Sequence, residues 1–242
     1  MKLRLRGRPL KAMVLTCNLI RIMPTEGNIL SLYAVRNGLR LLLFIGGIKM
    51  NKQLKKLTVT AIMVALATVL SMIKVIQMPL GGSVTLISML PIIVVSIMFG
   101  IGWGFGGAFG YSLIQLIFGI ASDGLLGWGL SGKQLAGCIA LDYIVAYTVL
   151  GIAGIFGSKN TWSQVCGAVL AMVLRFLSHF ASGYIIFANF EQFDFFGKTF
   201  VGRPILYSIC YNGFYMLPEL VITCVVIFIL SKTGVFDRIK SL

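Results

Sequence analysis

Four ionisable side chains lie inside otherwise apolar stretches of the sequence, and they are Asp142, Arg175, His179 and Glu219. A charge at mid-membrane costs at least about 2.5–3.5 kcal/mol on insertion scales, so each of them needs a partner or a function. Arg175, His179 and Gly183 follow one another at intervals of four residues, which places them along one stripe of a helix. An arginine and an imidazole on one face, with a glycine beside them, are typical of the wall of a polar cavity. The alternative is an Arg175–Asp142 ion pair that only ties two helices together.

A carboxylate followed by an aromatic ring stands at Asp142 and Tyr143. In a pocket of low dielectric constant a carboxylate attracts a cation strongly, and aromatic faces add to this attraction. The pair therefore predicts a site for a cationic ligand. The alternative is a structural acid that is bonded to a neighbouring hydroxyl group.

A polar and aromatic stripe follows near the C-terminus, where Tyr207, Tyr211 and Tyr215 are four residues apart and Asn212 adjoins them. A buried Asn offers both a donor and an acceptor, so Asn212 is suited to the edge of a heterocycle. For Tyr215 we favour the simpler interpretation of an anchor at the membrane interface. The sequence indicates no role for Glu219, and a structural acid is as good an interpretation as any other.

The remaining reactive side chains indicate no metal or cofactor chemistry. His179 is the only histidine, so a multi-histidine metal site cannot be built. The five cysteines form no C-x-x-C pair and are expected to be small core residues of membrane helices. The sequence contains no Walker motif, and we expect no ATPase site, no cofactor and no metal.

The composition shows what kind of element must position these side chains. Of the 242 residues, 58% are hydrophobic and 12% are charged, and the mean hydropathy is +0.95. Soluble domains carry about a quarter charged residues, so the composition predicts an integral membrane protein in a lipid bilayer. The positive charge belongs mainly to residues 1–56, which hold 12 Lys and Arg and one acid, Glu26. Because the body is nearly neutral, nucleic acid is not an expected partner.

Six apolar runs are long enough to cross a bilayer core of about 30 Å as helices. They cover residues 57–76, 84–101, 103–121, 135–156, 164–187 and 205–230. Turn signals separate them, among them Gly81-Gly82, Gly102 and Gly157-Ser158. The third run is rich in glycine, which favours close helix packing. The predicted fold is an all-α membrane protein, a bundle of six transmembrane helices within residues 50–242.

An even number of spans places both ends of this bundle on one side of the membrane. Lys52, Lys55 and Lys56 precede the first run and Lys232 follows the sixth, whereas the opposite loops mix both signs of charge. By the positive-inside rule, both termini of this multi-pass protein of the cell membrane are expected to be cytoplasmic.

Residues 1–49 differ from the rest as a basic N-terminal extension. Their longest apolar stretch, 41–48, is too short to span a membrane, and no clear signal-peptide cleavage site follows it. We interpret Met50 as the natural initiator and the preceding residues as an untranslated or disordered extension. The competing interpretation is a basic tail that touches anionic lipid.

Four segments carry a resemblance to a known family. They are Met78–Leu86, Leu141–Ala146 with Gly151–Gly154, Leu174–Gly183 and Tyr207–Asn212. Together they resemble the substrate-binding (S) components of energy-coupling-factor vitamin transporters, and among these the thiamine-specific branch. The resemblance covers about residues 52–235, and its most specific part is the basic–His–Gly stripe followed by Tyr-x-x-x-x-Asn.

This resemblance implies a six-helix bundle whose vitamin pocket opens to the outside under the loop between the first two helices. It implies substrate-binding roles for Asp142, Tyr143, Arg175, His179, Gly183, Phe187, Tyr207 and Asn212. The chain also departs from the family, since some members have Glu, Lys and Trp where Asp142, Arg175 and Phe187 stand. Tryptophans that close the pocket in some members fall near Gly82 and Tyr111, and Trp128 is a candidate replacement for a missing ring.

The implied ligand, thiamine, joins a cationic thiazolium to a flat aminopyrimidine. The resemblance implies that His179 and Phe187 stack on it and that Asp142 supplies a countercharge or accepts from the amino group. Tyr207 and Asn212 would then bind the pyrimidine edge. Arg175, which is unexpected beside a cation, would orient the carboxylate or meet a phosphate or hydroxyl end.

The same resemblance implies protein partners, namely a transmembrane coupling subunit and two cytoplasmic ATPase subunits. The coupling subunit would pack on a face of the first helix formed by Ala61 and Ala65, which are four residues apart. A small-x-x-x-small pattern of this kind also occurs in packing within one chain.

Two other functions stay open at this point. One is an S component for another vitamin or a thiamine precursor, for example riboflavin. The other is an intramembrane enzyme that uses Asp142, His179 and Arg175 for acid–base chemistry, although no Ser or Cys nucleophile stands in a recognisable setting.

Overall fold

The computed structural model describes residues 51–78, 81–85, 87–187, 200 and 202–236. The predictions for residues 1–49 and for Met50 as initiator lie outside these residues.

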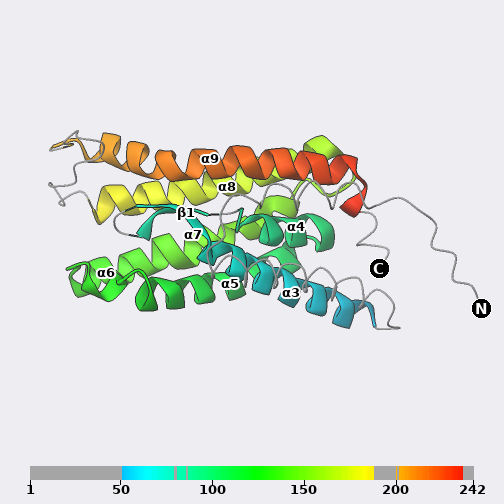
Figure 1. The fold of residues 1–242 in the computed structure, drawn as a ribbon, viewed down its shortest axis with the longest axis horizontal. Coiled ribbons are helices and arrows are strands. Elements are labelled where there is room, and N and C mark those ends of the chain that lie inside the picture. Colours follow the sequence, from blue (N-terminus) through cyan, green and yellow to red (C-terminus); the bar gives the residue numbers. More distant parts are fainter. Residues whose placement is uncertain (1–50, 79–80, 86, 188–199, 201, 237–242) are drawn as a thin grey trace, which may run out of the picture.

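Five helices in the described residues are long and apolar enough to cross a membrane. They are α3 (Lys52–Met72), α5 (Ile101–Ala121), a composite fourth helix (Gly132–Gly154), α8 (Thr161–Ile185) and α9 (Pro204–Lys232). A further helix, α4 (Leu90–Phe99), has ten residues and lies among them. The helices form an elongated bundle (Figure 1). The predicted helical membrane fold is confirmed, with one helix much shorter than expected.

The apolar runs on either side of the first turn do not remain helical throughout. α3 ends at Met72, and the last residues of the predicted first span form strand β1 (Lys74–Gln77). The predicted second span, 84–101, is wrong at its start, because Ser83–Thr85 form strand β2, which pairs antiparallel with β1, and α4 begins only at Leu90. Val75 and Ile76 are β-branched, and such residues favour strands over helices. The two strands make a short hairpin between α3 and α4.

The turn between α4 and α5 lies at Gly100 and not at Gly102, where the sequence predicted it. Gly100 has a φ of 89°, a backbone conformation that glycine adopts without strain, and it caps both helices. Pro91 lies in the first turn of α4, where the missing N–H of a proline leaves no helical bond unmade.

The fourth helix is continuous but irregular. A capping box between Ser131 and Gln134 starts it. It then passes through α6 (Gly132–Cys138), the π-helix η3 (Ile139–Val145), α7 (Ala146–Thr148) and the 3-10 helix η4 (Val149–Gly154). π turns are rare and are frequent at functional sites. In this chain the π-helical segment carries Asp142 and Tyr143.

Small residues let α4, α5 and η4 pack closely against one another. A side chain at Gly104 would clash with Ser96, and one at Gly151 would lie 2.6 Å from the backbone nitrogen of Phe105. Ser96 Oγ donates to the carbonyl of Gly151 and accepts from the N–H of Gly154 at 2.8 Å. The predicted close packing of the glycine-rich third run is thus confirmed at Gly104.

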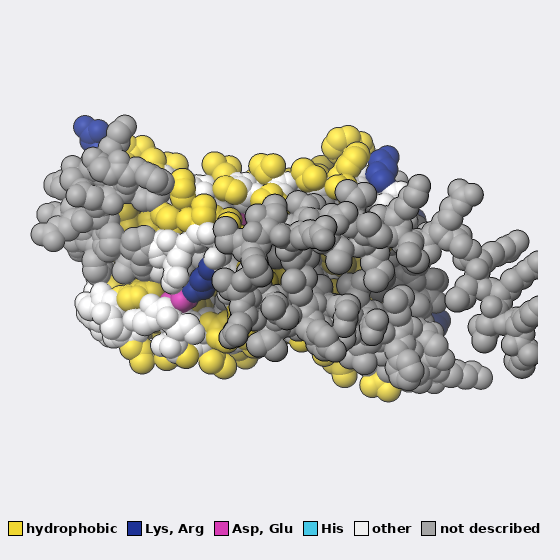
Figure 2. Space-filling view, viewed as in Figure 1, with side chains coloured by type: hydrophobic (Ala, Val, Ile, Leu, Met, Phe, Trp, Pro, Cys, Tyr) yellow, Lys and Arg dark blue, Asp and Glu magenta, His cyan; other side chains and the backbone are white. Residues whose placement is uncertain are grey.

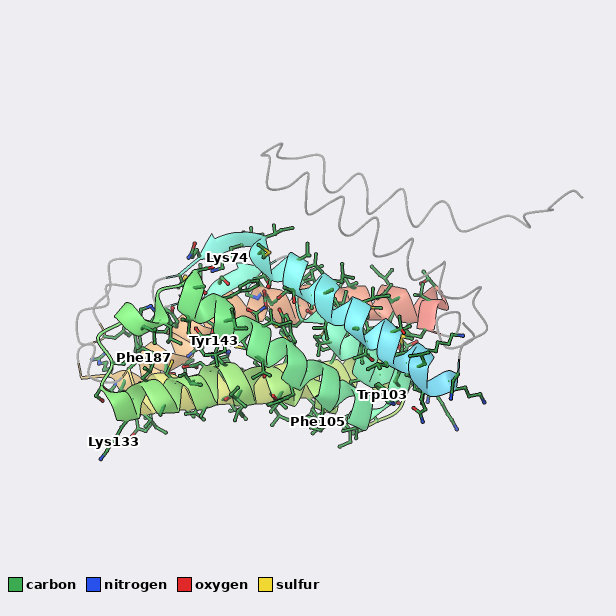
Figure 3. All side chains as sticks on the ribbon, turned by 90° about the horizontal axis from the view of Figure 1, so that it is seen from below. Lys74, Trp103, Phe105, Lys133, Tyr143 and Phe187 are labelled. Carbon is green, nitrogen blue, oxygen red and sulfur yellow. The ribbon has the colours of Figure 1, made fainter. Side chains whose placement is uncertain are left out.

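The positions of the helix ends and of a few side chains distinguish the two ends of the bundle. α3 begins and α9 ends at the same end (Figure 1). Lys74, Tyr143 and Phe187 lie in the half toward Lys133 (Figure 3), whereas Trp103 lies in the other half. Hydrophobic side chains follow the long flanks of the molecule (Figure 2). These flanks are the surfaces expected to meet lipid.

Candidate ligand-binding pocket

A cavity of about 220 Å³ lies under the β1–β2 hairpin, between α5, the fourth helix, α8 and α9. At roughly 10–15 Å³ for each water-sized sphere, it has room for a small organic molecule. The structure brings all eight of the predicted substrate-binding residues to its wall. They are Asp142 and Tyr143 on the fourth helix, Arg175, His179 and Gly183 on α8, Phe187 just after α8, and Tyr207 and Asn212 on α9.

The carboxylate of Asp142 is held by donors on two helices. His179 Nδ1 lies 2.8 Å from its Oδ1, and the hydroxyl of Ser182 donates to its Oδ2. The thiol of Cys138, one turn earlier on its own helix, donates to Oδ2 at 3.3 Å. These three donors hold the Asp142 carboxyl group in one orientation at the cavity wall.

Arg175 reaches Asp142 through His179 and not directly. Its Nε donates to His179 Nε2 at 3.3 Å, so Nε2 accepts and the ring proton must be on Nδ1, which donates to the carboxylate. A neutral imidazole thus connects a cation to an anion. The guanidinium also lies over the ring of Tyr147, 4.3 Å from its centroid, and contacts the sulfur of Met89. The direct Arg175–Asp142 pair, which was the structural alternative, does not form.

The α9 wall is organised around Asn212. Its Nδ2 donates to the carbonyls of Ser208 and His179 at 2.9 and 3.2 Å, and its Oδ1 accepts from the hydroxyl of Tyr215 at 2.9 Å. Tyr215 is 4% exposed and lines the cavity, so its interpretation as an interface anchor is wrong. A side chain at Gly183 would clash with Ser208 Oγ, so this glycine serves the contact of α8 with α9.

Several aromatic rings also line the cavity. Trp128 follows the short 3-10 helix η2 (Leu125–Gly127), and its ring centroid lies 6.3 Å from that of Phe187. This position supports the interpretation of Trp128 as a replacement ring. The hydroxyl of Tyr143 fills the space beside Gly119 of α5, where any larger residue would clash. Tyr207 and Tyr211 stack with centroids 5.7 Å apart.

The hairpin covers the cavity and is fixed at two places. At its base, Glu219 Oε1 accepts from the backbone N–H of Thr85 at 2.7 Å and from the Thr85 hydroxyl. At the mouth, Lys74 of β1 forms an ion pair with Asp123, just after α5. The structure thus gives Glu219 a role for which the sequence offered no signal, as the anchor of the cover on α9.

Two further groups of residues complete the comparison with the sequence. Ala61 and Ala65 lie on the exposed face of α3, away from the cavity. Gln115 and Tyr147 line the cavity but were not predicted. Gln115 could have been noticed as a polar side chain in the apolar run 103–121, whereas Tyr147 carries no distinguishing signal.

Comparisons with known proteins agree with one another. A family model described as thiamine transporter protein (Thia_YuaJ) matches residues 57–236. The chain is 31% identical over 199 residues to the thiamine transporter ThiT of Bacillus subtilis, covering 76% of this chain and 94% of the relative. The solved structure of ThiT from Listeria monocytogenes superposes with a TM-score of 0.60 at 24% identity, covering 78% of this chain and 99% of that one. This structural likeness concerns the fold.

The family match also removes the enzyme alternative, because the matched proteins are transporters. By the extent of the family match and the identity to a full-length relative, the chain belongs to the Thia_YuaJ family of thiamine transporter proteins.

Proposed function

We propose that the cavity captures thiamine and that the chain is the substrate-binding membrane subunit of an energy-coupling-factor ABC transporter. The observation that carries the proposal is the fixed carboxylate of Asp142 in a cavity walled by aromatic rings. Membership of the family supports thiamine as the ligand.

The wall offers what each half of thiamine needs. The cationic thiazolium is attracted by the Asp142 carboxylate, and each contact with an aromatic face adds about 0.5–2 kcal/mol. Phe187 and Trp128 are the nearest rings of the mouth for stacking on a flat heterocycle. Tyr207 and Asn212 offer hydroxyl and amide groups to the aminopyrimidine edge.

Arg175 is compatible with a cationic ligand because its charge is already compensated. Its guanidinium lies over the ring of Tyr147 and donates a hydrogen bond to His179, and His179 in turn donates one to Asp142. We propose that Arg175 keeps the proton of His179 on Nδ1. His179 can then donate a hydrogen bond to the Asp142 carboxylate and hold it in place. Arg175 acts on the ligand through these two residues.

Direct binding tests the ligand. Trp128 lines the cavity, so its fluorescence should change when thiamine is titrated into the purified protein. An Asn212→Ala variant should bind at least about tenfold more weakly, since it loses a ligand contact and the Tyr215 bond. Asn160→Ala, at an exposed position before α8, is the matched control and should bind like the wild type. Competition by riboflavin but not thiamine would instead favour the other-vitamin alternative.

We further propose that a transmembrane coupling subunit packs on the Ala61/Ala65 face of α3 and that two ATPase subunits drive transport. Support comes from the exposure of both alanines on an apolar helix that also exposes Leu57. An Ala65→Trp variant should lose uptake in cells while its thiamine affinity stays unchanged. Equal loss of both activities would contradict this role for α3.

We infer that both ends of the bundle face the cytoplasm. α3 begins and α9 ends at one end, where Lys52, Lys55, Lys56 and Lys232 lie. The cavity lies in the other half (Figure 3), which then faces outward. Cysteine labelling at position 133 from outside intact cells tests this orientation, because Lys133 is exposed at that end.

A further inference from the structure

Gln115 is a polar residue of the cavity wall that the proposed function has not used. It lies in the middle of α5 and is only 9% exposed. Gln115, Phe118 and Ser122 line the cavity at helical spacings of three and four residues, so they form the face that α5 presents to it. This face therefore presents a side-chain amide to the cavity.

The amide nitrogen of Gln115 has no hydrogen-bond partner among the described residues. An unmade hydrogen bond of a buried donor is costly, so the amide favours a partner that can reach it through the cavity. By contrast, Asp142, His179 and Asn212 on the other walls are each bonded to neighbouring helices. Gln115 thus differs from these residues in having an unsatisfied donor.

A second buried glutamine shows what a structural role looks like in this fold. Gln164 on α8 is 4% exposed, and its Nε2 donates to the carbonyl of Ser158 at 2.8 Å, which closes the turn before that helix. Its Oε1, like Gln115 Nε2, has no partner among the described residues, so the contrast concerns the donor alone. Gln164 does not line the cavity. A glutamine that only connected elements would be bonded in this way, and Gln115 is not.

We infer that Gln115 is a further substrate-binding residue, whose side-chain amide donates to an acceptor atom of the bound molecule. The inference rests on the proposed function and names the acceptor as a ring nitrogen or a hydroxyl oxygen of thiamine. The terminal amide torsion of glutamine is soft, so a small rotation can present the nitrogen to the cavity. Binding then gives the amide nitrogen of Gln115 a partner that no described residue supplies.

The test compares Gln115→Leu with the matched control Gln164→Leu, using calorimetric titration of the full-length protein with thiamine. Gln115→Leu should bind about tenfold more weakly, as expected for the loss of one neutral hydrogen bond. Gln164→Leu should keep the wild-type affinity. The melting temperature without ligand should fall for Gln164→Leu but not for Gln115→Leu, because only Gln164 has a hydrogen bond to lose.

Two analogues then identify the acceptor, one without the hydroxyl group and one with a pyrimidine nitrogen replaced by C–H. The wild type and Gln115→Leu should bind the analogue that lacks the acceptor with equal affinity. Together with the affinities for thiamine, these values complete a double-mutant cycle. If both analogues distinguish the two proteins as thiamine does, the assigned contact is wrong.

The possible failures are distinguishable. A wild-type protein that does not bind thiamine overturns the proposed function itself. A wild type that binds, with Gln115→Leu within twofold of it, overturns only the role of Gln115. If Gln115→Leu does not fold, the affinity of Gln115→Met for thiamine tests the same contact. Failure of both variants to fold would show a structural role and overturn the inference.

Discussion

Replacing Asp142 by Asn tests the central charge of the pocket with the smallest change of shape. In the structure Oδ1 accepts from His179 Nδ1, and Oδ2 accepts from Ser182 and Cys138. An Asn can keep its oxygen toward His179, while its NH2 group then faces the other two side chains. The Ser182 hydroxyl can rotate to accept from that group, so we expect the variant to fold.

The expected loss is one charge-assisted interaction with the ligand. Such interactions contribute about 1.5–3 kcal/mol, which corresponds to an affinity for thiamine that is roughly 10–150-fold weaker. Any long-range attraction of the carboxylate for the thiazolium would be lost in addition, because the amide carries no charge.

The assay is equilibrium binding of thiamine to detergent-solubilised protein, with Ser112→Ala as the control. Ser112 is fully buried on α5, and its hydroxyl bonds only within its own helix, to the carbonyl of Phe109. The control should bind like the wild type. An Asp142→Asn affinity within threefold of the wild type would refute the assignment of this carboxylate as the counter-charge.

Two other predictions concern packing and closure. Gly183→Ala should lower the free energy of unfolding by about 1–3 kcal/mol, because the added methyl group would clash with Ser208. Adding Ser208→Gly should restore part of this loss. An unchanged melting temperature of the single variant would contradict the close contact of α8 with α9. Lys74→Gln should release thiamine up to about fivefold faster in stopped-flow measurements, because a partly exposed ion pair with Asp123 contributes up to about 1 kcal/mol. The control Lys133→Gln, at an exposed position, should release thiamine at the wild-type rate. Equal release rates for the two lysine variants would show that the ion pair does not hold the cover.

The predicted site depended on helical spacing and on a family resemblance. Arg175, His179 and Gly183 could be placed on one stripe because they are four residues apart, and the structure has them on one wall. The connection of Arg175 to Asp142 through His179 could not be predicted, since it depends on how α8 is rotated toward the fourth helix. The sequence fixes a face of one helix, whereas distances between helices depend on packing of the whole bundle.

The cover was the least predictable part. Residues 73–77 are as apolar as the helix before them, so hydropathy alone extends the first span into β1. Glu219 was visible as a buried acid, but its partner Thr85 is 134 residues away in the chain. The role of Glu219 could not be predicted for this reason, because it depends on a contact between distant segments.

The shortness of α4 determines how a solute can reach the interior. Ten helical residues rise about 15 Å, half the thickness of a bilayer core, and the hairpin occupies the depth that the rest of a full span would fill. Within the hairpin, β2 pairs with β1, and the backbone N–H of Thr85 donates to Glu219. Swinging the hairpin sideways would expose these groups to hydrocarbon. This arrangement favours entry along the long axis of the bundle, from the aqueous phase at the end where the hairpin covers the cavity.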